Sequence, residues 1–448
     1  MKSLMGTLTI KSLDDLAAHI KAKHPSLYFS SQTSTVIPFD RLLRSPHKNG
    51  MDLVNLSQIP GEMEWAGKNL LCRGGVTWKE AGEFCLESGR EIMTYPTEEL
   101  ACVLAGVATS CTGERSFGYG TLRDQVVSLT TLGKEGKAIH LKKNRKLLEH
   151  SLFQDQRAKD LLKAYGDSYR EYEGFKNAPF PRLETEVDLM IGLEGQLGVV
   201  TEVELQTIPK GHSRYLFFEL PPWEKDDSSH LEILERVQPL RRLIRCCELI
   251  DSNGMEFLEK SLRPATGKDF IFLEILEEHF DEICERLASS LGPIGENQMY
   301  EMPVSKFQKL RMAIPRAVSE ENSRRGVIKK GTDIQVRTEQ MAKLMGLYRK
   351  LAGKGIPYTL FGHFGDAHLH FNFLPTAKEA DACERSLESL YGEVLKMKGS
   401  PFAEHGIGLI KQKFIRPFLS DIHFEMFRYL KSTMDPLNIF FSNGYLNL

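Results

Sequence analysis

The chain has 448 residues, of which 41% are apolar and 26% charged, and its formal net charge at pH 7 is -2. This length exceeds one ordinary hydrophobic core, so we expect two or three domains. The small net charge gives no electrostatic case for nucleic acid or an anionic membrane as a partner, and no apolar run reaches the length of a transmembrane helix.

The N-terminus and the cysteines bear on location. The opening sequence MKSLMGTLTIKSLDDL has no long apolar segment, so we expect no signal peptide. The eight cysteines form no C-x-x-C pair, which argues against a zinc ribbon or an iron–sulfur cluster. Buried, reduced thiols in a cytoplasmic protein are the simplest interpretation.

The first forty residues predict a strand, a capped helix and a second strand. Thr7–Ile10 is apolar and β-branched, and Ser12 can cap a helix whose first turn carries two aspartates. Ser26–Phe29 reads as the next strand and leads into the polar loop Ser30–Val36. Such a loop can present N–H groups and hydroxyls to phosphates, although an ordinary surface loop fits the pattern equally well.

The next informative stretch is Tyr95–Asp124, which follows predicted strands at Leu53–Leu56 and Leu70–Arg73 and a helix at about 78–88. It is rich in glycine and hydroxyl residues and poor in large side chains. Small residues let the backbone approach a large flat ligand, so we interpret the stretch as a cofactor site; a glycine-rich irregular loop is the alternative.

Residues Asp188–Pro209 predict a strand, a glycine turn and a strand. Gly192, Gly195 and Gly198 recur every third residue, but no helix follows, which excludes a P-loop or a Rossmann fingerprint. Beyond Pro209, helices and strands alternate and predict a second α+β domain. Its expected strands are 215–219, 243–250 and 270–275, and its expected helices lie near 231–240, 253–262 and 277–291.

Histidines gather in GHFGDAHLHFN, residues 362–372. If Phe364–Ala367 closes a hairpin, His363 lies opposite His368, and His370 shares their face. EHGIG, residues 404–408, offers a carboxylate and a fourth imidazole. The pattern favours a metal or proton-transfer centre over a strand with merely polar cross-strand pairs.

Several motifs, taken in order, resemble those of the FAD-linked oxidases of the vanillyl-alcohol oxidase/PCMH type. The similarity is greatest to the branch of D-2-hydroxyglutarate dehydrogenase, D-lactate dehydrogenase, the glycolate oxidase flavin subunit and alkyl-dihydroxyacetone-phosphate synthase. The matching segments are RGGVTW (73–78), AGVATSCTGERSFGYGTLRDQV (105–126), IGLEGQLGVVTEVEL (191–205), the histidine hairpin, EHGIG and DPLNIFFSNG (435–444).

This resemblance implies an α+β fold in three parts. Residues 1–209 would form a PCMH-type FAD-binding domain of two subdomains. Residues 210–400 would form a substrate or cap domain with an antiparallel sheet, and residues 401–448 would return to the flavin and close the active site.

The resemblance also implies site residues. FAD would be bound without a covalent link by Ser31, Gln32, Thr33, Ser34, Thr35, Gly106, Thr109, Ser110, Gly113, Arg115, Glu194, Gly198, Val200 and Asn443. A divalent metal, Zn²⁺ or another ion, would be bound by His363, His370 and Glu404. His405 would be the general base, and Asn372, Lys330 and Arg311 would contact the substrate.

One histidine adds to the family pattern. His368 stands where related sequences carry asparagine. It is a fourth ligand, a hydrogen-bond partner or a cross-strand neighbour, and the last two roles are favoured.

The function implied is an FAD-dependent oxidoreductase that dehydrogenates a small 2-hydroxy acid of the D-lactate, glycolate or D-2-hydroxyglutarate type by hydride transfer to flavin. One alternative is a non-redox flavoenzyme like alkyl-dihydroxyacetone-phosphate synthase. The other is a partner-dependent subunit with a degenerate flavin site, since Ser30–Gln32 replaces the usual glycines.

The expected partners are a small anionic substrate and a separate electron acceptor: a quinone, a cytochrome or an electron-transfer protein. We expect no nucleic acid partner, and a homodimer is an expected assembly. The expected location is cytoplasmic, with a peripheral membrane location as an alternative.

Overall fold

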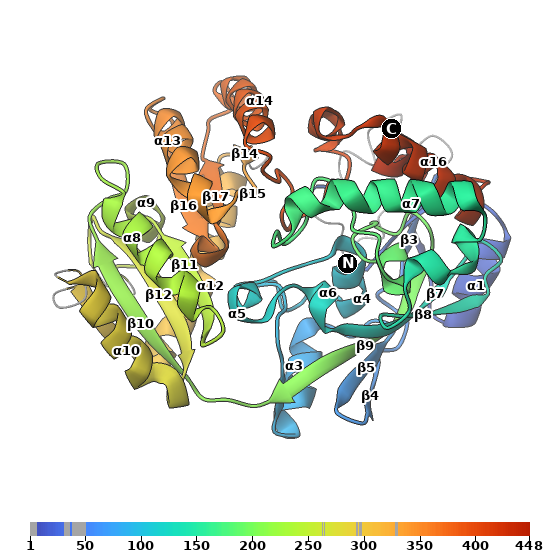
Figure 1. The fold of residues 1–448 in the computed structure, drawn as a ribbon, viewed down its shortest axis with the longest axis horizontal. Helices are drawn as coiled ribbons and strands as arrows, with labels where there is room; N and C mark the ends of the chain where they lie inside the picture. The colour runs from blue at the N-terminus through green and yellow to red at the C-terminus, as the bar shows by residue number, and fades with distance from the viewer. Residues whose placement is uncertain are drawn as a thin grey trace. The chain divides into compact units, whose positions relative to one another are not determined.

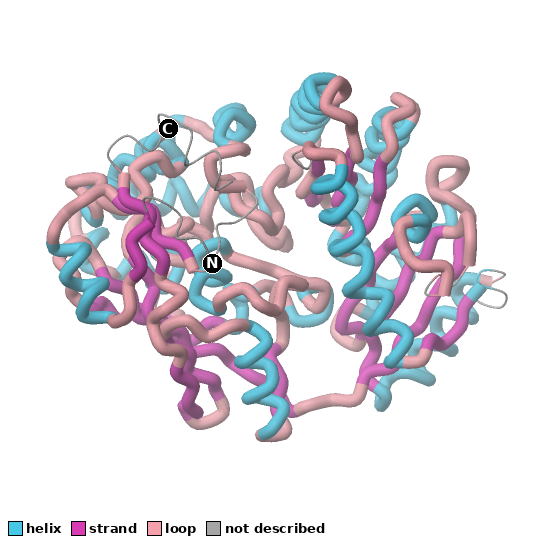
Figure 2. The backbone as a smooth tube through the Cα atoms, turned by 180° about the vertical axis from the view of Figure 1, so that it is seen from behind, coloured by secondary structure: helices cyan, strands magenta, loops and turns pink. Residues whose placement is uncertain are grey.

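The computed structural model describes residues 7–30, 36–37, 51–261, 263, 265–292, 294, 298–327 and 330–448. The chain divides into two compact units, drawn in Figure 1 and from behind in Figure 2. The first unit comprises Met1–Thr112, Thr121–Lys210 and Glu404–Leu448, and the second comprises Gly113–Gly120 and Gly211–Ala403. The chain therefore returns to the first unit at its C-terminal end, and a short piece of the glycine-rich stretch packs in the second.

Two sheets form the framework of the first unit. A parallel sheet has the strand order β1-β3-β2, and an antiparallel sheet has the order β4-β5-β9-β7-β8, with β6 paired to β9. The strands are β1 (Thr7–Thr9), β2 (Ser26–Phe29), β3 (Asp52–Asn55), β4 (Glu62–Ala66), β5 (Asn69–Arg73), β6 (Arg90–Ile92), β7 (Val126–Leu132), β8 (Ala138–Lys142) and β9 (Val199–Pro209).

Helices complete the first unit. The predicted helix α1 is confirmed, since the Ser12 hydroxyl accepts a hydrogen bond from the Asp15 N–H at 3.1 Å. α7 and α16 pack against each other in the same unit (Figure 1). The helices are α1 (Leu13–Lys21), α3 (Trp78–Glu87), α4 (Val103–Thr109), α6 (Leu122–Gln125), α7 (Gln156–Tyr169), α15 (Gln412–Ile415) and α16 (Asp421–Met434).

An eight-stranded sheet forms the framework of the second unit, with the order β13-β10-β12-β11-β16-β17-β14 and β15 paired to β17. Its pairings are antiparallel. The strands are β10 (Ser213–Leu220), β11 (Ile244–Ile250), β12 (Asp269–Leu276), β13 (Met299–Met302), β14 (Lys330–Gly331), β15 (Ile334–Gln335), β16 (Tyr358–Gly362) and β17 (His368–Phe373).

Helices lie on both faces of this sheet (Figure 2), so every residue of β11 is buried. Side chains of β10, β11 and β12 form one core with α9 and α12, and α8 packs with α10, which contacts β10 and β12. The helices are α5 (Ser116–Tyr119), α8 (Ser228–Val237), α9 (Ser252–Glu256), α10 (Glu277–Leu291), α12 (Val304–Arg324), α13 (Met341–Ala352) and α14 (Ala380–Lys396).

One alternative and one expectation from the sequence differ from this fold. The alternative of an irregular loop over 95–124 is wrong, because the stretch contains α4, α5 and α6. The helix expected near 253–262 ends at Glu256, capped at its start by Asp251, whose carboxylate accepts from the Gly254 N–H.

Other expectations of the sequence agree with the structure. The architecture is α+β, and the eight cysteines are free thiols, all buried except the half-buried Cys284. Among the described residues, the helices are too short or too polar to cross a membrane.

Candidate active site

The predicted histidine hairpin is confirmed. β16 and β17 pair in the register that sets Phe361 opposite His370 and Thr359 opposite Asn372. Continuing that register sets His363 opposite His368, and the His368 N–H donates to the His363 carbonyl at 3.2 Å. Gly362 has a φ of +130°, and a Cβ there would lie 2.9 Å from the His370 ring. The turn therefore needs glycine beside the imidazoles.

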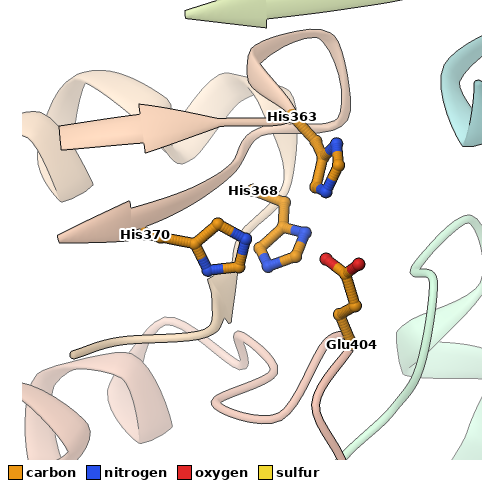
Figure 3. A group of neighbouring side chains, drawn as sticks. All are labelled: His363, His368, His370 and Glu404. Atoms are coloured by element: carbon orange, nitrogen blue, oxygen red, sulfur yellow. The ribbon is translucent and has the colours of Figure 1, made fainter. Parts of the chain in front are cut away.

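Each of the three imidazoles has one ring nitrogen hydrogen-bonded to an oxygen of the same unit, and Figure 3 shows the rings. The His363 Nδ1 lies 2.9 Å from the Glu248 Oε1, and the His368 Nε2 lies 3.0 Å from the Asp333 Oδ1. The His370 Nδ1 lies 3.2 Å from the carbonyl oxygen of Thr332. Carboxylates and carbonyls accept hydrogen bonds, so the anchored nitrogen of each ring is the donor, and these contacts fix the orientation of the rings.

The three rings converge in the interior of the second unit. One ring nitrogen of each lies within 4.8 Å of the corresponding nitrogens of the others, and the side chains are 0–6% exposed. Three buried imidazoles whose ring nitrogens approach one point are suited to binding a divalent transition metal. The residues present therefore fit the metal that the sequence predicts.

Glu404 and His405 follow directly on the last residue of this unit. The Ala403 N–H donates a hydrogen bond to the backbone carbonyl of Asp333 at 3.0 Å. Asp333 is the residue whose carboxylate contacts His368, and Glu404 follows Ala403 directly in the chain. In the first unit, the loop that begins at these two residues is fixed by Glu194. The Glu194 carboxylate accepts from the N–H groups of Ile407 and Gly408 at 2.6 and 3.0 Å, and burial raises its pKa.

A pair of polar side chains extends the histidine face along the hairpin. Asn372 and Thr359 are fully buried and directly opposed. Within the described residues, the Asn372 Oδ1 and the Thr359 Oγ1 have no hydrogen-bond partner, whereas the Asn372 amide donates to the His370 carbonyl. Because a buried polar atom left unpaired costs about 1–3 kcal/mol, this pair is suited to a polar group of a ligand.

The other predicted substrate residues are placed differently. The Lys330 ammonium lies 2.6 Å from the Glu384 carboxylate, so its charge is already compensated. The side chain of Arg311 lies outside the described residues.

The predicted FAD residues fall into three groups. Ser31, Gln32, Thr33, Ser34 and Thr35 lie outside the described residues. Four others, all in the first unit, line a cavity of about 160 Å³: Thr109, Glu194, Gly198 and Val200. The third group does not line this cavity and consists of Gly106, Ser110, Gly113, Arg115 and Asn443.

Glycine and left-handed backbone recur beside this cavity. A Cβ on Gly106 would lie 2.9 Å from the Trp78 ring, so α4 can pack there only with glycine. Ser110 ends α4 with a φ of +50°, and its hydroxyl donates to the Asn177 side chain at 2.8 Å. The Asn443 carbonyl accepts from the Gln412 side chain at 2.7 Å.

The cavity wall is largely aliphatic and contains Leu27, Leu104 and Leu193 beside backbone of the glycine turn. Cofactor sites are typically concave and apolar with a few polar groups, so this wall fits a flat aromatic ring system.

Gly113 and Arg115 belong to the second unit. The Arg115 guanidinium holds the buried Glu274 carboxylate through two hydrogen bonds of 2.9 and 2.6 Å. Ser116 donates to the buried Asp366 at 2.8 Å, and Arg241 pairs with the same carboxylate. These contacts join the end of the glycine-rich stretch to the histidine turn within one unit.

Sequence reasoning missed the residues that orient the histidines. Glu248 is the signal that was available, because it is the single carboxylate in a fully buried strand whose only other charged residue is Arg245. Asp333 and Thr332 lie between two strands of two residues each, for which the sequence carries no periodic signal.

Comparison with known proteins gives a consistent result. Residues 247–442 match the family model described as FAD linked oxidases, C-terminal domain. The chain is 24% identical to a D-lactate dehydrogenase of Archaeoglobus fulgidus, over 88% of this chain and 81% of that protein. It is 24% identical to a D-2-hydroxyglutarate dehydrogenase of Xanthomonas citri pv. viticola, over 87% of this chain and 78% of that protein.

A mitochondrial cytochrome-type D-lactate dehydrogenase of Kluyveromyces lactis is 23% identical, and the match covers 83% of this chain but 61% of that protein. Among solved structures, an alkyldihydroxyacetonephosphate synthase matches 97% of this chain with a TM-score of 0.64 at 12% identity. The match covers 75% of that synthase chain, and at this identity it shows a shared fold.

Proposed function

We propose that this chain, whose residues 247–442 match the C-terminal domain of FAD linked oxidases, is an FAD-dependent dehydrogenase of a small D-2-hydroxy acid. The observation that carries the proposal is the group of three buried imidazoles, each with one nitrogen anchored. It lies in the part of the chain that the family model matches. The relatives named for D-lactate and D-2-hydroxyglutarate support a 2-hydroxy acid as the substrate class.

The proposal assigns the first unit to FAD and the second to the substrate. FAD, when bound, supplies the acceptor for the hydride that leaves the hydroxyl-bearing carbon. The aliphatic wall and the glycine turn of the first unit would hold its ring system. The segment 404–448 would close the site, held through Glu194.

In the second unit, His363 and His370, together with Glu404, would bind a divalent ion. Such an ion, when bound, supplies a positive charge that lowers the pKa of the substrate hydroxyl. His405 would then take the hydroxyl proton on a ring nitrogen, and its place directly after a metal ligand in the chain keeps the base near the metal. Asn372 would contact the substrate, because it is fully buried on the histidine face and its Oδ1 has no hydrogen-bond partner among the described residues.

The electron acceptor is proposed to be a separate molecule. Among the described residues no second redox group has a binding motif, and the cysteines form no cluster pattern. The cytochrome-type relative supports an external acceptor for the reduced flavin.

The test is anaerobic mixing of the purified flavoprotein with D-lactate, glycolate, D-2-hydroxyglutarate and D-malate, with metal content measured on the same sample. We expect at least one acid to bleach the flavin spectrum, and we expect chelation to slow that reduction. Bound flavin that none of the four acids reduces would contradict the proposal. A protein that stays colourless with added FAD would favour the degenerate-site alternative.

A further inference from the structure

We propose that His368 is a direct ligand of the metal, so that three imidazoles rather than two bind the ion. The inference rests on the metal centre of the proposed function and concerns a residue at which this chain differs from the family pattern. It stands on three observations of the second unit: the spacing of the rings, the partner of His368 and its burial.

The distances between the centres of the imidazole rings identify His368 as a metal ligand. An imidazole bound at 2.0–2.1 Å places its centre about 3.2 Å from the ion, so two rings at 90–110° have centres about 4.5–5.3 Å apart. The centre of the His368 ring lies 5.2 Å from that of His363 and 4.7 Å from that of His370. The His363 and His370 centres are 5.8 Å apart. His368 is thus the ring whose distances to both others match a shared ion.

The hydrogen bond of His368 to Asp333 is of the kind that metal-bound histidines make. Metal-bound histidines usually donate their second nitrogen to a carboxylate or carbonyl, which fixes the tautomer and the ring orientation. The His368 Nε2 has this contact with the Asp333 carboxylate at 3.0 Å, as His363 has with Glu248 and His370 with the Thr332 carbonyl. His368 therefore has the same kind of anchor as both predicted ligands, and the ring spacing distinguishes it from an anchored histidine elsewhere in the unit.

Burial places His368 where an ion would be shielded from water. His368 is fully buried and the Asp333 carboxylate is 1% exposed. Electrostatic attraction is stronger away from water, so an ion on His368 would be stabilised by the nearby buried carboxylate.

The experiment counts imidazoles. Full-length protein is stripped with a chelator, reloaded with one equivalent of Zn²⁺ and measured by X-ray absorption, and Zn²⁺ affinity is measured by competition with a chelating dye. We expect three imidazoles for the wild type and two for His368→Asn, which carries the residue of related sequences. We expect the affinity of the variant to fall at least tenfold.

The chain provides a matched control in His230→Asn. His230 is also fully buried in the second unit, and its Nε2 lies 3.0 Å from the Asp269 carboxylate, but it belongs to α8 and not to the hairpin. The control should lose thermal stability but keep three imidazoles and an affinity within twofold of the wild type. If His368→Asn fails to fold, the imidazole count of the wild type alone decides.

Two imidazoles in the wild type, or an unchanged affinity in His368→Asn, would overturn the inference even if a hydroxy acid reduces the flavin. Three imidazoles in a protein whose flavin no hydroxy acid reduces would support the inference and overturn the proposed function. The two claims are therefore tested separately.

Discussion

The Arg115–Glu274 pair provides a quantitative prediction, because it decides between a structural and a cofactor role for Arg115. Burial alone would raise the pKa of Glu274, but the charge and hydrogen bonds of Arg115, with Ser213 and Arg245, lower that pKa from 4.5 to about 2. Because one pKa unit is 1.36 kcal/mol, this shift corresponds to about 3 kcal/mol in favour of the folded second unit.

The sign follows from the lowered pKa of the folded state. The contribution is fully present above pH 4.5 and is lost as the pH falls from 4.5 towards 2. Arg115→Met should remove most of it at pH 7, because the buried carboxylate then has only Arg245, 3.4 Å away, and Ser213 as partners.

Hydrogen exchange of β12 peptides in flavin-free protein measures this effect. We expect about a hundredfold loss of protection in Arg115→Met at pH 7, which is the exchange equivalent of about 3 kcal/mol. The matched control is Arg286→Met, which removes an exposed ion pair with Glu282 in the same unit and should change little. If β12 protection is unchanged in Arg115→Met, the reasoning is refuted and Arg115 acts on the cofactor alone.

Three further predictions concern the site. Glu248→Gln should weaken Zn²⁺ binding 10–100-fold, because the residue anchors His363, and a dye-competition titration with unchanged affinity would contradict this. Thr359→Val should leave the melting temperature of the substrate-free protein unchanged or slightly higher, because it removes an unpaired buried hydroxyl. The same variant should raise KM for the hydroxy acid, and a lower melting temperature would show that the hydroxyl is paired. Ala108→Phe should fill the first-unit cavity and lower the flavin-to-protein absorbance ratio at least tenfold. The control is Gly82→Ala, at a position with open space around it, and full flavin retention in Ala108→Phe would place the cofactor elsewhere.

The hairpin could be predicted because its determinants are local. Alternation along the strand and one short turn place His363, His368 and His370 on a common face, and the strand register agrees. The N-cap at Ser12 and the capping box at Thr77 are local in the same sense.

The anchors of the histidines could not be predicted, because they depend on pairings remote in sequence. Glu248 reaches His363 across 115 residues, and the Ser116–Asp366 hydrogen bond spans 250. The helices in the glycine-rich stretch could not be predicted, because short helices such as α5 have too few residues for a periodic signal. Lys330 had the charge of a substrate contact, but only the fold reveals its pairing with Glu384.

The central claim is that this chain transfers a hydride from a 2-hydroxy acid to FAD, with His405 as the base. The most direct measurement is anaerobic stopped-flow reduction of the bound flavin by the D and L forms of one acid, in the wild type and in His405→Asn. We expect rapid bleaching by the D form alone and a loss of rate of at least a hundredfold in His405→Asn. Equal reduction by both forms, or an unchanged rate in the variant, would contradict it.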